Sequence, residues 1–101
     1  MRFRFLHAAR TELKGASVAY KRIRIELGEK FKSALSKALD RIETWPLGCG
    51  KVYGEVRICR IQRFPYGIVY VARDEEIVVV AVMHLHRRPG YWKQRLKHID
   101  P

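Results

Sequence analysis

The stretch that decides the fold of this 101-residue chain is Ile77–His84, which reads IVVVAVMH, together with Leu85–Trp92, which reads LHRRPGYW. A run of residues that is apolar on both faces is typical of a central strand buried on both sides. Histidine, arginine and aromatic side chains follow where this strand ends. Because functional sites are commonly built at the end of a rigid element, we expect the site of this protein here.

Two amphipathic helices are predicted before this strand. Apolar residues between positions 6 and 27 recur at alternating spacings of three and four, which is typical of one helical stripe. A second stripe runs from position 31 to 42 and ends before Pro46. Gly28 is expected to break the chain between them. The two helices should therefore form a hairpin whose apolar stripes face each other.

The remaining segments are predicted to be strands, at residues 2–6, about 53–63, 68–72 and 77–84. Alternation in the second strand is imperfect, so we expect a bulge near Ile58. The helical hairpin would return the chain so that the second strand runs antiparallel to the first. The predicted fold is an α+β two-layer sandwich of order β-α-α-β-β-β. In it, the helical hairpin packs on one face of a mainly antiparallel four-stranded sheet, formed by one domain over residues 1–101.

The chain is strongly basic, with 21 Lys and Arg against 10 Asp and Glu and a formal charge of +11. Such an excess favours a polyanionic partner. No apolar run is long enough for a membrane span and no signal-peptide core is present, so we expect a cytoplasmic protein without a membrane partner. The spacing of Cys49 and Cys59 fits no zinc pattern, and free thiols are expected. No metal site and no cofactor are predicted.

The sheet face opposite the helices is expected to be open, or nearly so, and to carry a basic surface. If a bulge falls between Arg57 and Arg60, both side chains reach that face. For RNA cleavage, His84 and Tyr91 are the acid–base candidates, with Arg60 and Arg87 placed on phosphate. The candidates for binding a nucleic acid or another target are Arg57, Arg63, Arg88 and Trp92. The alternative is that the aromatic residues cover the sheet edge and the arginines serve solubility.

Three segments of the chain carry a resemblance to a known family. They are AxxEL at residues 9–13, RFPYGIVY at residues 63–70 and AVMHLHRRPGYW at residues 81–92. Together with the element order, they resemble the RelE/ParE superfamily of bacterial toxins from position 3 to about 95, on the ParE-like side. The resemblance implies the toxin of a type II toxin–antitoxin module, held inactive in a hetero-oligomer by a small antitoxin.

The same resemblance leaves the target open, because one branch of the superfamily cleaves mRNA on the ribosome and the other poisons DNA gyrase. Tyr91 resembles the C-terminal tyrosine of the nuclease branch, Arg60 one of its basic strand positions, and Arg87 its basic tail. Leu85 stands where that branch tends to carry an arginine. Three hypotheses therefore remain: a toxin directed at gyrase or translation, a ribosome-dependent endoribonuclease, and a non-toxic basic module that binds nucleic acid.

Overall fold

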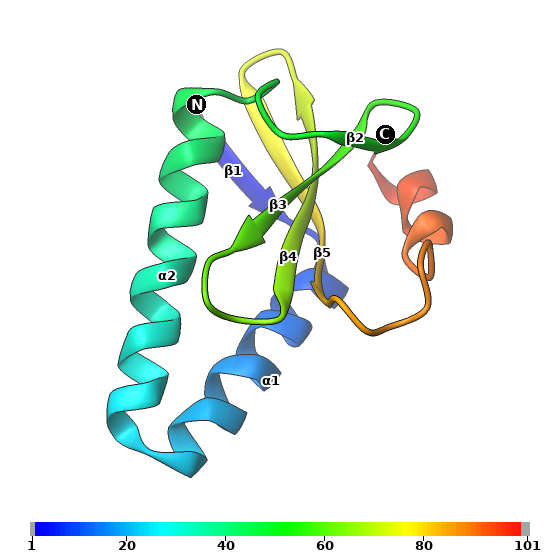
Figure 1. The fold of residues 1–101 in the computed structure, drawn as a ribbon. Coiled ribbons are helices and arrows are strands. Elements are labelled where there is room, and N and C mark those ends of the chain that lie inside the picture. The colour runs from blue at the N-terminus through cyan, green and yellow to red at the C-terminus, as the bar shows by residue number, and fades with distance from the viewer. Residues whose placement is uncertain (1, 100–101) are drawn as a thin grey trace.

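The structure, a computed structural model, describes residues 2–99. In chain order its elements are β1 (Arg2–Phe5), α1 (His7–Ile23), α2 (Ile25–Thr44), β2 (Lys51–Tyr53), β3 (Val56–Ile61), β4 (Tyr66–Arg73), β5 (Glu76–His84) and the short 3₁₀ helix η1 (Lys93–His98). The strands form a single five-stranded sheet of order β1-β5-β4-β3-β2 (Figure 1). The α+β class and the helical hairpin are thus as predicted. The sheet gains a fifth strand because the chain turns at Gly54, with φ +54°, and separates β2 from β3.

The sheet is mixed, because β1 pairs with β5 in parallel while every other neighbouring pair is antiparallel. Since β3 and β5 both run antiparallel to β4, β3 runs in the same direction as β1. The expected antiparallel relation between these two strands is therefore wrong. The first strand joins the sheet beside the last one, so it does not constrain β3 directly.

The helical hairpin turns at Arg24, four residues before the expected position. Arg24 is extended, with φ −159° and ψ 144°, and α2 begins directly after it. Gly28 lies inside α2, where a Cβ atom would come within 3.0 Å of the Lys21 Cβ and 3.1 Å of the Lys21 Cα. Its role is therefore to let the two helices approach closely. The predicted helix break at this glycine is wrong.

The sheet does contain a bulge in β5, and the register of β2 against β3 also shifts between Lys51 and Tyr53. Val69 pairs with Ala81 and Tyr70 pairs with Val79, so Val80 has no partner in β4. The pairing of β3 with β4 is continuous through Ile58, which makes the predicted position of the bulge wrong. The extra residue reverses the alternation of side chains along β5.

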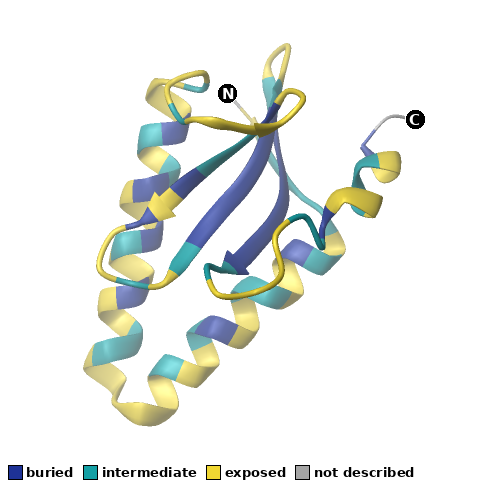
Figure 2. Cartoon of the chain, turned by 45° about the vertical axis from the view of Figure 1, so that its right-hand side comes forward, coloured by how far each residue is buried: buried dark blue, intermediate teal, exposed yellow. Residues whose placement is uncertain are grey.

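Two apolar layers cover the two faces of the sheet, and most of β4 and β5 between them is buried (Figure 2). The helices pack on one face, where Phe31, Ile42 and Tyr70 are completely buried. Burying a side chain of this size contributes about 1.5–3 kcal/mol. On the other face, Trp92, Leu96 and Ile99 of the C-terminal segment, residues 85–99, pack against the valines of β4 and β5. The expectation that this face is open is therefore wrong.

Among residues 2–99, no helix combines the length and the hydropathy needed to cross a bilayer.

Candidate functional site

The side chains that follow β5 converge on one carboxylate, that of Glu12 in α1. The Tyr91 hydroxyl donates to Glu12 Oε2 at 2.7 Å. Arg95 donates from both terminal nitrogens, Nη1 to Oε1 at 2.9 Å and Nη2 to Oε2 at 3.0 Å. Arg87 Nη1 lies 3.4 Å from Oε2. We call these four residues the Glu12 cluster; the bidentate Arg95–Glu12 pair is its strongest contact.

The Glu12 cluster satisfies an unpaired stretch of β5. Because β1 pairs with β5 only as far as Val79, the backbone beyond that point has β4 on one side and no strand on the β1 side. The Val82 amide donates to Glu12 Oε1 at 3.1 Å, and Arg95 Nη1 donates to the Val80 carbonyl at 3.0 Å. An exposed sheet edge can pair with another chain, and here the Glu12–Arg95 ion pair occupies the backbone groups of that edge.

The charges of this cluster are fixed by its hydrogen bonds. Burial raises the pKa of Glu12, but the bonds from Arg95 and Tyr91 and the positive charge of Arg95 outweigh burial, so this pKa lies below its usual value. Burial and the contact with Glu12 raise the pKa of Tyr91. The bond to Glu12 raises the pKa of Arg95. At neutral pH the cluster therefore holds an ionised Glu12, a neutral Tyr91 and a charged Arg95.

Tyr91 makes contacts within the protein through its ring as well as through its hydroxyl. The guanidinium carbon of Arg87 lies 3.8 Å from the centre of the ring, and that of Arg95 lies 5.2 Å from it. The predicted proximity of Arg87 and Tyr91 is thus present. Both residues bind within the protein, and a tyrosine with a raised pKa is poorly suited to accept a proton from a substrate.

The His84 ring packs against rings outside the Glu12 cluster, although the His84 carbonyl accepts the Arg87 amide at 3.0 Å. The centre of the His84 ring is 5.1 Å from that of Tyr66 and 5.1 Å from that of His86, and its Nδ1 accepts the His86 amide at 3.1 Å. Tyr66 packs against the apolar layer beneath the helices. His84 therefore lies at the end of the sheet with aromatic neighbours, and Arg60 is not among its contacts.

The structure does not bring Arg57 and Arg60 to one face. Arg57 lies on the same sheet face as the buried Cys59, beneath the helices, and its Nη1 donates to the carbonyls of Leu47 at 3.0 Å and Cys49 at 2.7 Å. Arg60 has the opposite alternation, is exposed, and uses its carbonyl to accept a 2.7 Å bond from Arg41. Because no bulge interrupts β3, the expected shared basic face is wrong.

The other predicted binding residues are dispersed. Arg88 is exposed in the turn after β5. Trp92 is only 3% exposed and packs in the second apolar layer, so its ring is not a stacking platform in this arrangement. Its Nε1 is buried and has no hydrogen-bond partner. Arg63, with φ +72°, sits in the β3–β4 turn beside α2.

Arg63 is part of a hollow of about 480 Å³ between α2 and the β3–β4 turn. Four cationic side chains line it, and no carboxylate does. We call it the basic groove; its lining residues are Leu27, Lys30, Ser33, Ala34, Lys37, Arg41, Gln62, Arg63 and Phe64.

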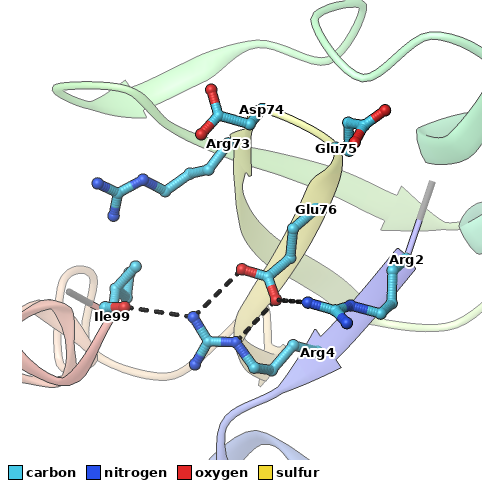
Figure 3. Close-up of a pocket in the computed structure, with 7 residues that line it drawn as sticks. All are labelled: Arg2, Arg4, Arg73, Asp74, Glu75, Glu76 and Ile99. Carbon is cyan, nitrogen blue, oxygen red and sulfur yellow. Dashed lines mark hydrogen bonds and ion pairs between the residues drawn. The ribbon is translucent and has the colours of Figure 1, made fainter. Parts of the chain in front are cut away.

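A second charged hollow lies at the start of β5, beside β1 (Figure 3). Arg4 donates to both carboxylate oxygens of Glu76, at 3.0 and 3.3 Å, and also to the Ile99 carbonyl at 3.2 Å. Arg2 reaches the same carboxylate at 3.4 Å. These bonds lower the pKa of Glu76. They tie β1, β5 and the end of the C-terminal segment together, which indicates a structural role.

Glu12 is the glutamate of the AxxEL motif, but it is not among the predicted site residues. It stands between Ala9 and Leu13 in the apolar stripe of α1, one turn before the buried Ala16. A carboxylate inside an apolar stripe of a basic chain is the signal that marks it, because such a group needs a partner when it is buried. Within residues 2–99, no three metal-ligating side chains gather at one point.

Comparison with known proteins agrees with this architecture. A search of curated protein sequences finds no match. Among solved structures, one described as "Chromosomal ParDE TA system from P. aeruginosa" is similar, with a TM-score of 0.61 and 17% identity, covering 83% of this chain and 95% of that chain. At this identity the likeness concerns the fold. The family described as "ParE toxin of type II toxin-antitoxin system, parDE" matches residues 3–89. The chain therefore belongs to the ParE toxin family.

Proposed function

We propose that this protein is a growth-inhibiting toxin that a cognate antitoxin neutralises and that acts by binding DNA gyrase, without cleaving RNA. Membership of the ParE family supports the toxin role. The observation that carries the mode of action is the Glu12 cluster. It occupies both the hydroxyl and the ring of Tyr91, the residue that a nuclease would need free.

Two assays on the purified chain separate the modes of action. Supercoiling by gyrase should be blocked, while mRNA on the ribosome should stay intact. Tyr91→Phe and His84→Ala should both retain the effect on gyrase and on growth, since neither side chain acts on a substrate. RNA cleavage that both substitutions abolish would establish the endoribonuclease instead. Unchanged growth after induction without an antitoxin would favour a non-toxic nucleic-acid-binding module.

The basic groove is the surface that we propose for an acidic segment of the antitoxin. Lys30, Lys37, Arg41 and Arg63 line it without a carboxylate, so an acidic chain would meet only attractive charge there. The apolar Phe64 offers a contact at its edge. A partner of this chemistry also matches the net charge of +11.

Charge reversal on α2 tests this surface. Lys37→Glu lies in the basic groove, whereas Lys32→Glu makes the same charge change on the same helix outside it. Lys37→Glu should weaken the antitoxin complex at least about tenfold, roughly 1.4 kcal/mol, and Lys32→Glu much less. Equal losses in the two variants would mean that net charge, and not the groove, governs binding. The partner for this measurement is to be sought as a short acidic protein encoded beside this gene.

A further inference from the structure

The two cysteines lie opposite each other where the chain enters the sheet. Lys51 pairs with Arg57, and the Ile58 amide donates to the Gly50 carbonyl at 3.1 Å. Continuing this antiparallel register one residue beyond the Gly50–Ile58 pair places Cys49 opposite Cys59. Both thiols are free. Facing residues of antiparallel strands have Cβ atoms about 4.5–5.5 Å apart, close to the spacing that a disulfide spans.

Other contacts hold this arrangement in place. The Arg57 guanidinium donates to the Cys49 carbonyl at 2.7 Å and so keeps the incoming loop against β3. The Cys49 thiol interacts with the Cys59 thiol and with the Tyr70 hydroxyl. The Tyr70 hydroxyl in turn donates to the Pro46 carbonyl at 2.7 Å. The loop before β2 is thus anchored on both sides of Cys49.

The two thiols differ in access. Cys49 is partly exposed, whereas Cys59 is 3% exposed and lies beneath the helices. Burial and the contact with Cys49 raise the pKa of Cys59, and Arg41, whose Nη2 lies 3.5 Å from the sulfur, offsets part of this rise. A small oxidant in solvent can therefore reach Cys49 more readily than Cys59.

We propose that Cys49 and Cys59 form an oxidisable dithiol, in which Cys49 reacts with a low-molecular-weight disulfide and Cys59 resolves the product. The Cys49 thiolate attacks one sulfur of glutathione disulfide, the S–S bond breaks, and one glutathione leaves and takes up a proton. The Cys59 thiolate then attacks the Cys49 sulfur, and the second glutathione leaves as a thiol. Two protein thiols are oxidised, and one glutathione disulfide is reduced to two glutathione molecules.

The bond would join the loop before β2 to β3 and enclose β2 in a ring. That loop carries Trp45 and Leu47, which are 66% and 67% exposed. Oxidation would therefore fix the position of an exposed apolar surface. This proposal does not depend on the target of the toxin.

Mass spectrometry of the full chain in glutathione redox buffers tests the proposal. The wild type should lose two hydrogen atoms without gaining glutathione or dimerising, and a dithiol reductant should restore it. Wild-type protein in which both thiols stay open to alkylation, or in which only a stable glutathione adduct or a dimer forms, would overturn the proposal.

Two substitutions test the order of the steps. Cys59→Ala, which adds no buried polar group, should trap one glutathione on Cys49. Cys49→Ser should remain unmodified, because Cys59 is buried. Circular dichroism checks that each variant is folded, and the wild-type mass result stands without either of them. Modification of Cys59 in the folded Cys49→Ser variant at the wild-type rate would contradict the assigned order.

Discussion

At the scale of single residues, Glu12 has the widest influence, because one carboxylate joins α1, the edge of β5 and the C-terminal segment. Glu12→Gln would remove the charge and leave Arg95, whose side chain is 19% exposed, without a counter-ion. We expect a loss of about 1–3 kcal/mol in the free energy of unfolding. Urea denaturation at neutral pH measures it, and a variant as stable as the wild type would contradict the structural role of the cluster.

The same substitution should change the dependence of stability on pH. The pKa of Glu12 is lowered in the folded state, so its stabilising contribution is complete above the unfolded pKa of about 4.3 and is lost as pH falls through the folded pKa. The difference in stability between the wild type and Glu12→Gln should therefore be constant near neutral pH and shrink below about pH 4. Denaturation curves over this range give the result; a difference that grows on acidification would contradict it.

Trp92 offers a second prediction at this scale. Its indole is buried, but Nε1 has no hydrogen-bond partner. Trp92→Phe removes that unsatisfied donor together with part of the packing, so its stability should stay within about 1 kcal/mol of the wild type. Trp92→Ala removes the whole side chain and should cost about 3–5 kcal/mol. Equal losses in the two variants, measured by urea denaturation, would show that the indole nitrogen has a partner in solution.

The contacts of single residues can be predicted from the sequence only where the partners are close along the chain. The proximity of Arg87 and Tyr91 is predictable, because both follow β5 within a few positions. Glu12 is about 70 positions or more away from its partners, so no local pattern connects them. The expected common face of Arg57 and Arg60 depends on a bulge that β3 does not have.

At the scale of elements, the helical hairpin depends on a close approach at Gly28. A Cβ atom added at Gly15, in α1, would meet no other atom within 4 Å, whereas one added at Gly28 would meet the backbone of Lys21 at 3.1 Å. Gly15→Ala should raise the free energy of unfolding by about 0.5–1 kcal/mol, because alanine favours the helix.

Gly28→Ala should not be more stable than the wild type, because the gain in helix propensity is offset by pushing the two helices apart. Thermal or urea denaturation of the two variants in parallel makes the comparison. A similar stabilisation in both would show that the hairpin can open at Gly28 without loss.

Some features of the helices and strands can be predicted from the sequence and others cannot. The number and order of the helices and the strands from Val56 onward follow from periodicity. The bulge at Val80 does not, because every residue from Ile77 to Met83 is apolar and fits either face of the sheet. Gly28 resembles a helix end in the sequence, since the sequence does not show how closely two helices approach each other.

At the scale of the whole molecule, the net charge of +11 dominates association. The isolated chain should bind DNA and RNA of arbitrary sequence. This binding should weaken at least about tenfold as salt rises from roughly 50 to 200 mM, because counterion release drives it. Fluorescence anisotropy with labelled oligonucleotides measures the dependence. Affinity that is insensitive to salt would indicate specific contacts instead.

The α+β class is the part of the whole molecule that the sequence determines best, since hydrophobic periodicity, the helix order and the family motifs all agree. The direction of β1 relative to β3 is not determined in this way, because it depends on pairing between the two ends of the chain.

That pairing has a consequence for biosynthesis. Phe3 is beside Ile77 and Phe5 beside Val79, so β1 must wait during synthesis for a partner strand that follows it at a long distance in the chain. Contacts between such distant segments cannot form on a partial chain. The sheet therefore cannot be completed until β5 has been synthesised, and a nascent chain without β5 lacks the strand that joins β1 to β4.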